Sequence, residues 1–386
     1  MEGVTEALRE AFESGPDWCL GLMSGTAMDG VDAALVLTDG EEITGFGPSL
    51  FSAYPKGSMA AARSVHADGL RLRAGGDPAL VAAAGAEVDA AHAAACAALL
   101  AAPAAPDAAL VGYHGQTVAH APDEGWTWQL GDGAALAKAL RRPVAWDFRS
   151  ADMTAGGQGA PLAPFFHWAL ARRIGAPGPV AFLNLGGVGN VTWADPQADG
   201  PEAPGALLAF DTGPANAPVD DWMRRQAGLP HDPDGRHAAA GKVHEGVFKA
   251  NSVRAYLGRR PPKSLDRNDF AQAAASAEGL SLEDGAATLT ALSARMAAAA
   301  QDHFPAPVSR WLVCGGGRRN AALMAMLAER VEAPVQAVEE AGLDGDMLEA
   351  QCFAWLAARV VRGLPLSAPG TTGVAGPTPG GRLARP

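Results

Sequence analysis

Gly21–Asp32 reads GLMSGTAMDGVD and Leu183–Asn190 reads LNLGGVGN, and in each a glycine-rich turn separates two apolar runs. Around the first turn, Trp18–Met23 and Val31–Leu37 are apolar, and Ile43–Phe51 follows after a second turn. Short apolar runs bounded by glycine and aspartate predict strands. The first of these stretches therefore predicts an antiparallel meander.

The pattern starts again in the second half of the chain. Pro179–Leu185 is apolar, a glycine turn follows, and Val191–Ala194 and Leu207–Phe210 continue the apolar runs. Ala286–Phe304 then predicts a long helix, and Trp311–Cys314 predicts a strand that runs into three glycines. Each half is rich first in strands and then in helices, as a duplicated α/β domain would be.

We therefore expect an α/β protein of two domains with two terminal segments. Residues 18–160 form the first domain, to which a helix over 346–364 returns, and residues 161–345 form the second. Residues 1–17 are expected to be a helical extension. Residues 365–386 are rich in Pro, Gly and Thr and predict a loosely ordered tail.

Composition and charge exclude several classes of protein. Of the 386 residues, 48% are hydrophobic, enough for sizeable cores, and the net charge of −12 argues against nucleic acid or an anionic membrane as partner. The four cysteines show no metal-ligand spacing and predict reduced thiols. The acidic N-terminus is unlike a signal peptide, and the run Ala79–Ala102 contains Glu87 and Asp89, so it predicts a helix of a soluble protein. We expect a cytoplasmic protein.

The first glycine turn predicts a phosphate site. Glycines and small hydroxyls between two strands direct several backbone N–H groups into one concavity, which binds phosphate without a lysine. The residues concerned are Gly25, Thr26, Ala27, Met28, Asp29, Gly30, Val31 and Asp32. Of these, Asp29 and Asp32 offer the hard oxygen ligands that Mg²⁺ prefers. An ordinary hairpin with glycines at positive φ would fit the same letters, and the chain has neither a Walker lysine nor a GxGxxG motif.

Two further glycine turns extend this hypothesis. The second-half hairpin would hold phosphate through Gly186, Gly187, Gly189 and Asn190. The segment VCGGGRRN, Val313–Asn320, would let the chain pass close to adenine or ribose, through Gly315, Gly316, Gly317 and Asn320. A tight strand-to-helix turn is the alternative interpretation of this last segment.

Two carboxylates are candidates for the chemistry itself. Asp211, in FDTGPAN, follows a strand end, where a carboxylate can act as a general base on a hydroxyl or on water. It could instead only cap the following helix. Glu349, in GLDGDMLEA, enters the last helix and could bind substrate or serve as a first-turn charge.

Polar segments at strand ends offer the contacts of a polyhydroxyl substrate. They are YHGQTVAH (113–120), QLGDG (129–133) and WDFRSADMTAGGQGAPL (146–162). The candidate donors and acceptors are His114, Gln116, Thr117, Arg149 and Asp152. Each of them taken singly could equally stabilise a loop.

Seven of these motifs, in order from GLMSGTAMDGVD to GDMLEAQCFAWLA, resemble the anhydro-N-acetylmuramic acid kinase family of the actin, heat-shock chaperone and hexokinase superfamily. The resemblance runs from Trp18 to about Gly373. It implies an actin-like ATPase fold with two ribonuclease-H-like domains and the active site in the interdomain cleft. Relatives are dimers, so it also implies a homodimer.

The resemblance further implies an unusual reaction. Such enzymes use ATP, Mg²⁺ and water to open 1,6-anhydro-N-acetylmuramic acid while phosphorylating O6, and the product is N-acetylmuramic acid 6-phosphate, in cell-wall (peptidoglycan) recycling. The family's base falls on Asp211, a substrate ligand on Glu349, and the nucleotide segment on Gly25–Asp32. Related alternatives are a kinase for another anhydrosugar such as levoglucosan, or a sensor that binds ATP and sugar without turnover and has no need of a base at Asp211.

The sequence departs from the family pattern at a few places. Ala27-Met28 replaces the usual Ser-Leu, which removes a hydroxyl from the phosphate turn. Leu265–Asn268 replaces Thr-Gly-Arg-Glu, so the role of that loop in substrate binding is open. Tyr113 and Ala217-Pro218 also differ near the expected sugar site.

Overall fold

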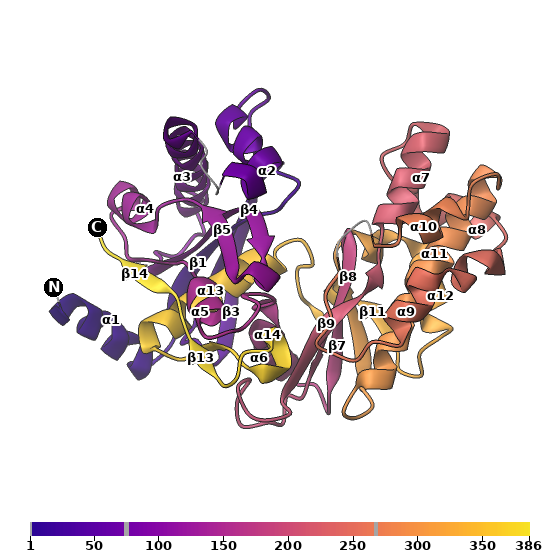
Figure 1. Ribbon diagram of the computed structural model, residues 1–386. Coiled ribbons are helices and arrows are strands. Elements are labelled where there is room, and N and C mark those ends of the chain that lie inside the picture. Colours follow the sequence, from indigo (N-terminus) through magenta and orange to yellow (C-terminus); the bar gives the residue numbers. More distant parts are fainter. Residues whose placement is uncertain (1, 73–76, 266–268) are drawn as a thin grey trace. The chain divides into compact units, whose positions relative to one another are not determined.

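The computed structural model describes residues 2–72, 77–265 and 269–386, and the chain divides into two compact units. Unit 1 comprises Met1–Arg173 and Met347–Pro386, and unit 2 comprises Ile174–Asp346 (Figure 1). The chain thus leaves the first unit once and returns to it for its last forty residues.

Unit 1 is built on a mixed sheet in the order β3-β2-β1-β4-β6-β14, with β5 paired to β4. The pairs β1–β2 and β2–β3 are antiparallel, and β4 runs parallel to both β1 and β6. The strands are β1 (Asp17–Ser24), β2 (Gly30–Thr38), β3 (Ile43–Ala53), β4 (Leu110–Ala121), β5 (Trp126–Leu130), β6 (Val144–Trp146) and β14 (Arg382–Ala384).

Unit 2 repeats the same plan with the order β9-β8-β7-β10-β11. Its first three strands again form an antiparallel meander, and β10 is again parallel to β7 and β11. The strands are β7 (Val180–Leu185), β8 (Val188–Ala194), β9 (Leu207–Pro214), β10 (Arg310–Cys314) and β11 (Val335–Ala337). This shared order, with shared strand directions, is that of ribonuclease-H-like domains and confirms the expected duplication.

The helices differ more between the units than the strands do. In unit 1 they are α1 (Glu2–Ser14), α2 (Ala60–Leu72), α3 (Pro78–Leu100), α4 (Gly133–Leu140), α5 (Ser150–Thr154), α6 (Ala163–Arg173), α13 (Leu348–Arg362) and α14 (Pro369–Thr372). In unit 2 they are α7 (Ala217–Ala227), α8 (Arg236–Ala240), α9 (Asn251–Leu257), α10 (Ala271–Ala275), α11 (Leu282–Ala298) and α12 (Ala321–Ala328). In unit 2, Ala294 and Ala297 of α11 join the core that its sheet forms with α12.

Two helices cover opposite faces of the unit 1 sheet. Side chains alternate along a strand, so Leu20 and Leu22 of β1 join the core that includes α3, while Gly21 faces α13. A Cβ atom at Gly21 would overlap the carbonyl oxygen of Ala350 in α13. Glycine at this position therefore lets α13 lie directly on the strands, at the start of the chain's first glycine turn.

Among the described residues, α3 is the one helix with the length and apolar composition of a membrane span. Its Val88 and Cys96 are part of the unit 1 core. Its two acidic side chains are also engaged, because Glu87 accepts a hydrogen bond from the amide of Ala62 and Asp89 accepts one from the hydroxyl of Tyr113. These contacts are those of a helix that covers a sheet.

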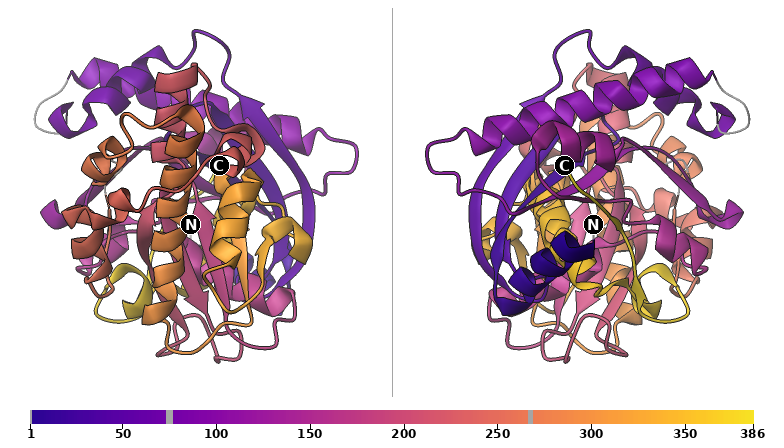
Figure 2. Two further views of the ribbon diagram at one scale, coloured as in Figure 1. Left: turned by 90° about the vertical axis from the view of Figure 1, so that its right-hand side faces the viewer. Right: turned by 90° about the vertical axis from the view of Figure 1, so that its left-hand side faces the viewer.

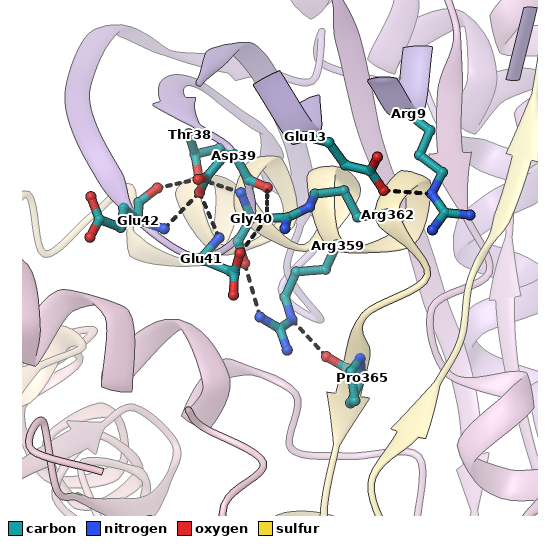
Figure 3. Close-up of polar contacts among 10 residues, drawn as sticks. All are labelled: Arg9, Glu13, Thr38, Asp39, Gly40, Glu41, Glu42, Arg359, Arg362 and Pro365. Carbon is teal, nitrogen blue, oxygen red and sulfur yellow. Dashed lines mark hydrogen bonds and ion pairs between the residues drawn. The ribbon is translucent and has the colours of Figure 1, made fainter. Parts of the chain in front are cut away.

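The end of α13 is anchored by two arginines to the turn between β2 and β3 (Figure 3). Arg359, only 1% exposed, donates to the carbonyls of Gly40 at 2.9 Å and Pro365 at 2.6 Å. Arg362 donates to the carbonyl of Asp39 at 3.0 Å and pairs with Glu41 at 2.6 Å. Because these partners lie in unit 1, they fix the returning helix to the first unit.

The domain crossing and the N-terminal segment differ from those expected from the sequence. Helix α6 lies in unit 1, so the chain crosses between Arg173 and Ile174 and not near residue 160. The N-terminal segment is not a separate extension, because α1 contacts α13 and Phe12 is buried. The right-hand view of Figure 2 shows α1, in indigo, against the gold α13 that it contacts.

The C-terminal segment is ordered, which corrects the expectation of a loose tail. β12 (Pro365–Ser367) pairs with β13 (Thr378–Pro379), and β14 adds an antiparallel edge strand to β6. Arg382 of β14 also stacks on the ring of Trp146. Proline and glycine shape the turns of this segment, while its polar side chains and short strands hold it to the sheet.

Candidate functional site

The first glycine turn of unit 1 projects its tip toward solvent. The amide of Met28 donates to the carbonyl of Gly25 at 3.1 Å and closes the turn, while Thr26 and Ala27 between them are exposed. Met28 adopts a left-handed conformation at φ 50°, and its side chain is buried in the core. The tip can therefore present backbone groups to a phosphate, whereas the Met28 side chain anchors the turn.

Gln116, which the sequence suggests as a substrate ligand, uses its side chain to support this turn. It is fully buried on β4, its side-chain nitrogen donates to the carbonyl of Gly25 at 3.2 Å, and its oxygen lies 2.7 Å from the hydroxyl of Ser24. The same hydroxyl lies 2.7 Å from that of Tyr54. This network fixes where β1 ends and the turn begins.

Arg63 of α2 supplies a cation at the turn, and sequence reasoning missed it. Its guanidinium donates to the carbonyl of Met28 at 2.5 Å, and the residue is exposed. A chain without a Walker lysine thus has a positive side chain at its proposed phosphate turn. No local signal in the sequence could reveal this contact, because the two residues are distant along the chain.

Asp29 and Asp32 flank the start of β2 and lie near the same phenol. Burial raises the pKa of Tyr54, and both carboxylates raise it further. Asp29 is exposed and Asp32 is half-buried. The described part of the chain holds no cluster of three or more His, Cys, Asp or Glu side chains for a metal. Two carboxylates fit the coordination of Mg²⁺, which also takes phosphate oxygens and water.

His114, Arg149 and Glu349 come together in unit 1. The buried imidazole of His114 accepts hydrogen bonds from Arg149 at 3.2 and 3.0 Å, and its Nδ1 lies 2.9 Å from the carbonyl of Gly115. Burial, assisted by Arg149, lowers the pKa of His114 well below its usual range, so the ring is neutral. Neutral His114 therefore orients Arg149.

Glu349, in the first turn of α13, is electrostatically coupled to this arginine. Burial of the Glu349 carboxyl raises its pKa, while the charge of Arg149 lowers it. The residue as a whole is nevertheless exposed to solvent. An arginine and a carboxylate with access to solvent can bind the hydroxyls and the acidic group of a sugar. The Glu349 carboxyl thus interacts electrostatically with a group outside its own helix.

Asp152 does not belong with these sugar-binding candidates. It is 3% exposed and accepts hydrogen bonds from the amide of Gly159 at 2.6 Å, from Thr372 at 2.6 Å and from Ser367. Oδ1 of Asp152 thus holds the C-terminal segment through Ser367 and Thr372, and Oδ2 holds the backbone at Gly159. Thr117 is half-buried and accepts a hydrogen bond from Gln129 at 3.2 Å.

A cavity of about 190 Å³ lies beside Arg149. Its lining includes Trp146, Asp147 and Gln129, from segments that the sequence marks as polar. Asp147 has a φ of 54°, a conformation that non-glycine residues rarely adopt and that often marks a functional site.

In unit 2, the second glycine hairpin and the triple-glycine turn lie against each other. Gly186 and Gly187 form the turn between β7 and β8, and their carbonyls accept hydrogen bonds from the amides of Asn216 and Ala215. Gly315 has a φ of 71°, and a Cβ atom there would overlap the end of β7. The glycines thus allow two turns to share one small region. Gly189 and Asn190 continue from this turn in β8, while Gly316 and Gly317 form the start of a short 3-10 turn.

Two asparagines complete this region in different ways. Asn320 caps α12, because its side chain accepts a hydrogen bond from the amide of Leu323 at 3.0 Å. This side-chain oxygen is used for capping and is not free for a nucleotide. Asn216, which the sequence did not single out, donates to the carbonyl of Leu185 at 3.0 Å and fixes the hairpin to the segment after β9.

Asp211 lies near the end of β9, and its side chain does not cap the following helix. The amide of Leu265 donates to its Oδ2 at 2.8 Å, and the hydroxyl of Tyr256 donates to its backbone carbonyl at 2.5 Å. Burial raises the pKa of Asp211 to about 6, although the Leu265 hydrogen bond lowers it. A half-buried carboxylate with this pKa is ionised at neutral pH and basic enough to accept a proton from water.

The loop whose sequence departs from the family pattern is only partly described. Leu265 contacts Asp211 as above, whereas Asp266–Asn268 lie outside the described residues.

The two sheets and their glycine hairpins define the class of protein. Paired ribonuclease-H-like units of this strand order are the actin-like ATPase fold, to which many sugar kinases belong. A sequence profile of the family described as anhydro-N-acetylmuramic acid kinase matches residues 17–384. The chain belongs to that family and is therefore a phosphotransferase.

Individual relatives agree with the family profile. The anhydro-N-acetylmuramic acid kinase of Cereibacter sphaeroides is 55% identical over 375 residues, which cover 97% of this chain and 98% of the relative. Anhydro-N-acetylmuramic acid kinase 1 of a Jannaschia species is 52% identical over 371 residues, 96% of each chain.

Solved structures show more distant likeness. Component A of the (R)-2-hydroxyglutaryl-CoA dehydratase from Acidaminococcus fermentans aligns with a TM-score of 0.46 and 12% identity, over 89% of this chain and 99% of that one. The fold assignment rests on the strand orders and not on this likeness.

Proposed function

We propose that this kinase opens 1,6-anhydro-N-acetylmuramic acid with water and phosphorylates O6, giving N-acetylmuramic acid 6-phosphate for peptidoglycan recycling. The observation that carries the proposal is Asp211, a half-buried carboxylate with one oxygen held by a backbone amide and a pKa raised to about 6. Family membership and the identity of the relatives support the choice of sugar.

The proposed reaction balances with ATP and one water molecule. Asp211 takes a proton from water, whose oxygen attacks the anomeric carbon. The bond between that carbon and O6 breaks, and O6 takes the γ-phosphoryl group from ATP, leaving ADP. Phosphoryl transfer depends more on positioning and charge than on covalent help from the protein.

The remaining residues are assigned to binding. We propose that Thr26 and Ala27 with Arg63 hold phosphate, that the unit 2 glycine turns hold the rest of the nucleotide, and that Arg149 and Glu349 hold the sugar. The proposal requires both units to act on one pair of substrates. Asp29 and Asp32 would hold Mg²⁺, which neutralises phosphate charge when bound.

Cytoplasmic location and a homodimeric state belong to the same proposal, since the proposed substrate is a recycled wall fragment and the family resemblance implies a dimer. Light scattering of the purified protein tests the second point, because a homodimer has twice the mass of the 39.3 kDa chain.

A panel of sugars tests the proposal against its rivals. The purified protein is incubated with ATP, Mg²⁺ and either 1,6-anhydro-N-acetylmuramic acid, levoglucosan or N-acetylglucosamine, and sugar phosphate is measured by mass spectrometry. We expect turnover of the first sugar by a large margin. Preference for levoglucosan would favour the related anhydrosugar kinase, and binding without product from any sugar would favour a sensor.

A further inference from the structure

Lys263 of unit 2 is a buried cation that the proposed reaction does not yet use. The residue is 6% exposed, and its ammonium nitrogen lies 4.6 Å from the ring centre of Tyr256 and 5.3 Å from that of Phe210. It also lies 3.3 Å from Nε2 of His303. Among the described residues it has no carboxylate partner, so aromatic faces and an imidazole hold this charge.

The neutral ring of His303 accepts a hydrogen bond from the Lys263 ammonium. Burial and the neighbouring Lys263 both lower the pKa of His303 below its usual range. A neutral imidazole offers one nitrogen lone pair, and the contact with Lys263 uses it. Lys263, Phe210 and His303 line a cavity of about 140 Å³, which Thr212 also lines.

The backbone around Lys263 contacts Asp211 from two directions. The amide of Asp211 donates to the carbonyl of Lys263 at 3.0 Å, and the amide of Leu265, two residues later, donates to Oδ2 of Asp211 at 2.8 Å. No described residue donates to Oδ1. The segment thus restrains one carboxylate oxygen and leaves the other for water.

The side chain of Lys263 contacts the two aromatic residues next to Asp211, Phe210 and Tyr256. Phe210 precedes Asp211 on β9, and Tyr256 donates its hydroxyl to the carbonyl of Asp211. The ammonium lies against both of these rings. One buried charge therefore links β9, α9 and the segment that restrains the carboxylate.

We propose that Lys263 is a positioning residue for Asp211, acting through the Lys263–Leu265 segment. This inference rests on the proposed role of Asp211 as the base. The charge of Lys263 holds the segment on Phe210 and Tyr256. The Leu265 amide therefore keeps Oδ2 of Asp211 in place, and Oδ1 faces the reacting water. Misplacement of a catalytic group by about 1 Å can lower a rate by about 100-fold.

The main test compares Lys263→Met with Lys249→Met. Methionine keeps an unbranched side chain of similar length but removes the charge, and Lys249 is an exposed lysine of the same unit. In Lys263→Met we expect kcat to fall by about 10- to 100-fold with the KM for ATP unchanged. The acidic limb of the kcat profile should move to higher pH, because a looser Leu265 hydrogen bond no longer lowers the pKa of Asp211 to the same extent. The control should match the unaltered protein.

Other charged or titratable groups near Asp211 also affect the pH profile of kcat. Tyr256 and Lys263 contact the Asp211 region directly, and Arg259 lies over the ring of Tyr256 at 5.4 Å. Arg260 acts electrostatically on His303. All of these remain in the Lys249→Met control.

Two further measurements separate this inference from the proposed function. Titration of the Asp211 carboxyl by ¹³C NMR, without any turnover, should show a higher pKa in Lys263→Met; an unchanged pKa together with unchanged kcat would overturn the positioning role. If Lys263→Met does not fold, as thermal unfolding would reveal, His303→Leu should give the same direction of change with a smaller size, and an unaltered His303→Leu profile would count against the inference. Absence of turnover in the unaltered protein would instead refute the proposed reaction.

Discussion

At the residue scale, Asp211 is the group on which the proposed chemistry depends. Its carboxylate is half-buried, restrained at Oδ2 and ionised at neutral pH. We expect Asp211→Asn to lower kcat by about 10²- to 10⁴-fold, the usual contribution of a general base, because the amide cannot accept the proton. ATP affinity, measured by calorimetry, should remain within about twofold, since the base contributes little to nucleotide binding. A near-normal rate in this variant would refute the assignment.

The pH dependence follows from the same carboxylate. Burial raises the pKa of Asp211 to about 6, and the reaction needs its ionised form. As pH falls below about 6, kcat/KM should therefore decrease, by about tenfold for each pH unit once the group is mostly protonated. Initial rates between pH 5 and 8 at constant ionic strength check this. A flat profile down to pH 5 would exclude an essential base with this pKa.

Arg63 is the residue-scale prediction for the nucleotide. Its guanidinium lies at the carbonyl of Met28, in a turn without a lysine. A hydrogen bond to a charged group contributes about 1.5–3 kcal/mol, so Arg63→Gln should raise the KM for ATP by about tenfold or more and leave the KM for the sugar unchanged. Arg225→Gln, an exposed arginine of α7, serves as the control and should change neither constant. An equal rise in both constants for Arg63→Gln would mean that Arg63 acts on the fold and not on ATP.

At the element scale, the returning helix α13 carries both a structural anchor and a proposed sugar ligand. Gly21 lets it approach β1, Arg359 holds its end to the β2–β3 turn, and Glu349 lies in its first turn. The position of Glu349 relative to Arg149 therefore depends on how firmly the helix is held in unit 1.

The arginine anchor can be tested by stability measurements. Arg359→Met leaves the buried carbonyl of Gly40 and the partly buried carbonyl of Pro365 without their charged donor, so the free energy of unfolding should fall by about 2 kcal/mol or more. The matched change Arg362→Met removes a pair with the exposed Glu41 and should cost less, about 1 kcal/mol. Urea unfolding of both variants gives the comparison. Equal losses would show that burial of Arg359 adds nothing to the anchor.

At the scale of the whole molecule, the sequence predicts the strand pattern well because that pattern is local. Apolar runs separated by glycine turns mark β1 to β3 and β7 to β9, and their repetition predicts two related units. Close to the chain's ends, prediction fails for a physical reason. The Pro- and Gly-rich segment after Pro365 is held by β6 and by Asp152, and the local composition contains no trace of these distant partners.

The site shows the same division between local and distant information. Residue types and motifs indicate Asp211 and the glycine turns. Gln116 and Asp152, however, have the same chemistry as sugar ligands, and only the fold shows that their polar atoms are bonded to the protein itself. Arg63 was missed because its contact with Met28 arises from the packing of α2 beside the turn.

The most direct test of the central claim is the fate of the water oxygen. The protein is incubated with ATP, Mg²⁺ and 1,6-anhydro-N-acetylmuramic acid in ¹⁸O-water, and the product is analysed by mass spectrometry, with N-acetylmuramic acid 6-phosphate in the same water as the control for exchange. We predict a 6-phosphate with ¹⁸O at the anomeric hydroxyl, above the exchange control, and none in the phosphate group. An unlabelled product, or label in the phosphate, would contradict hydrolytic ring opening coupled to phosphorylation of O6.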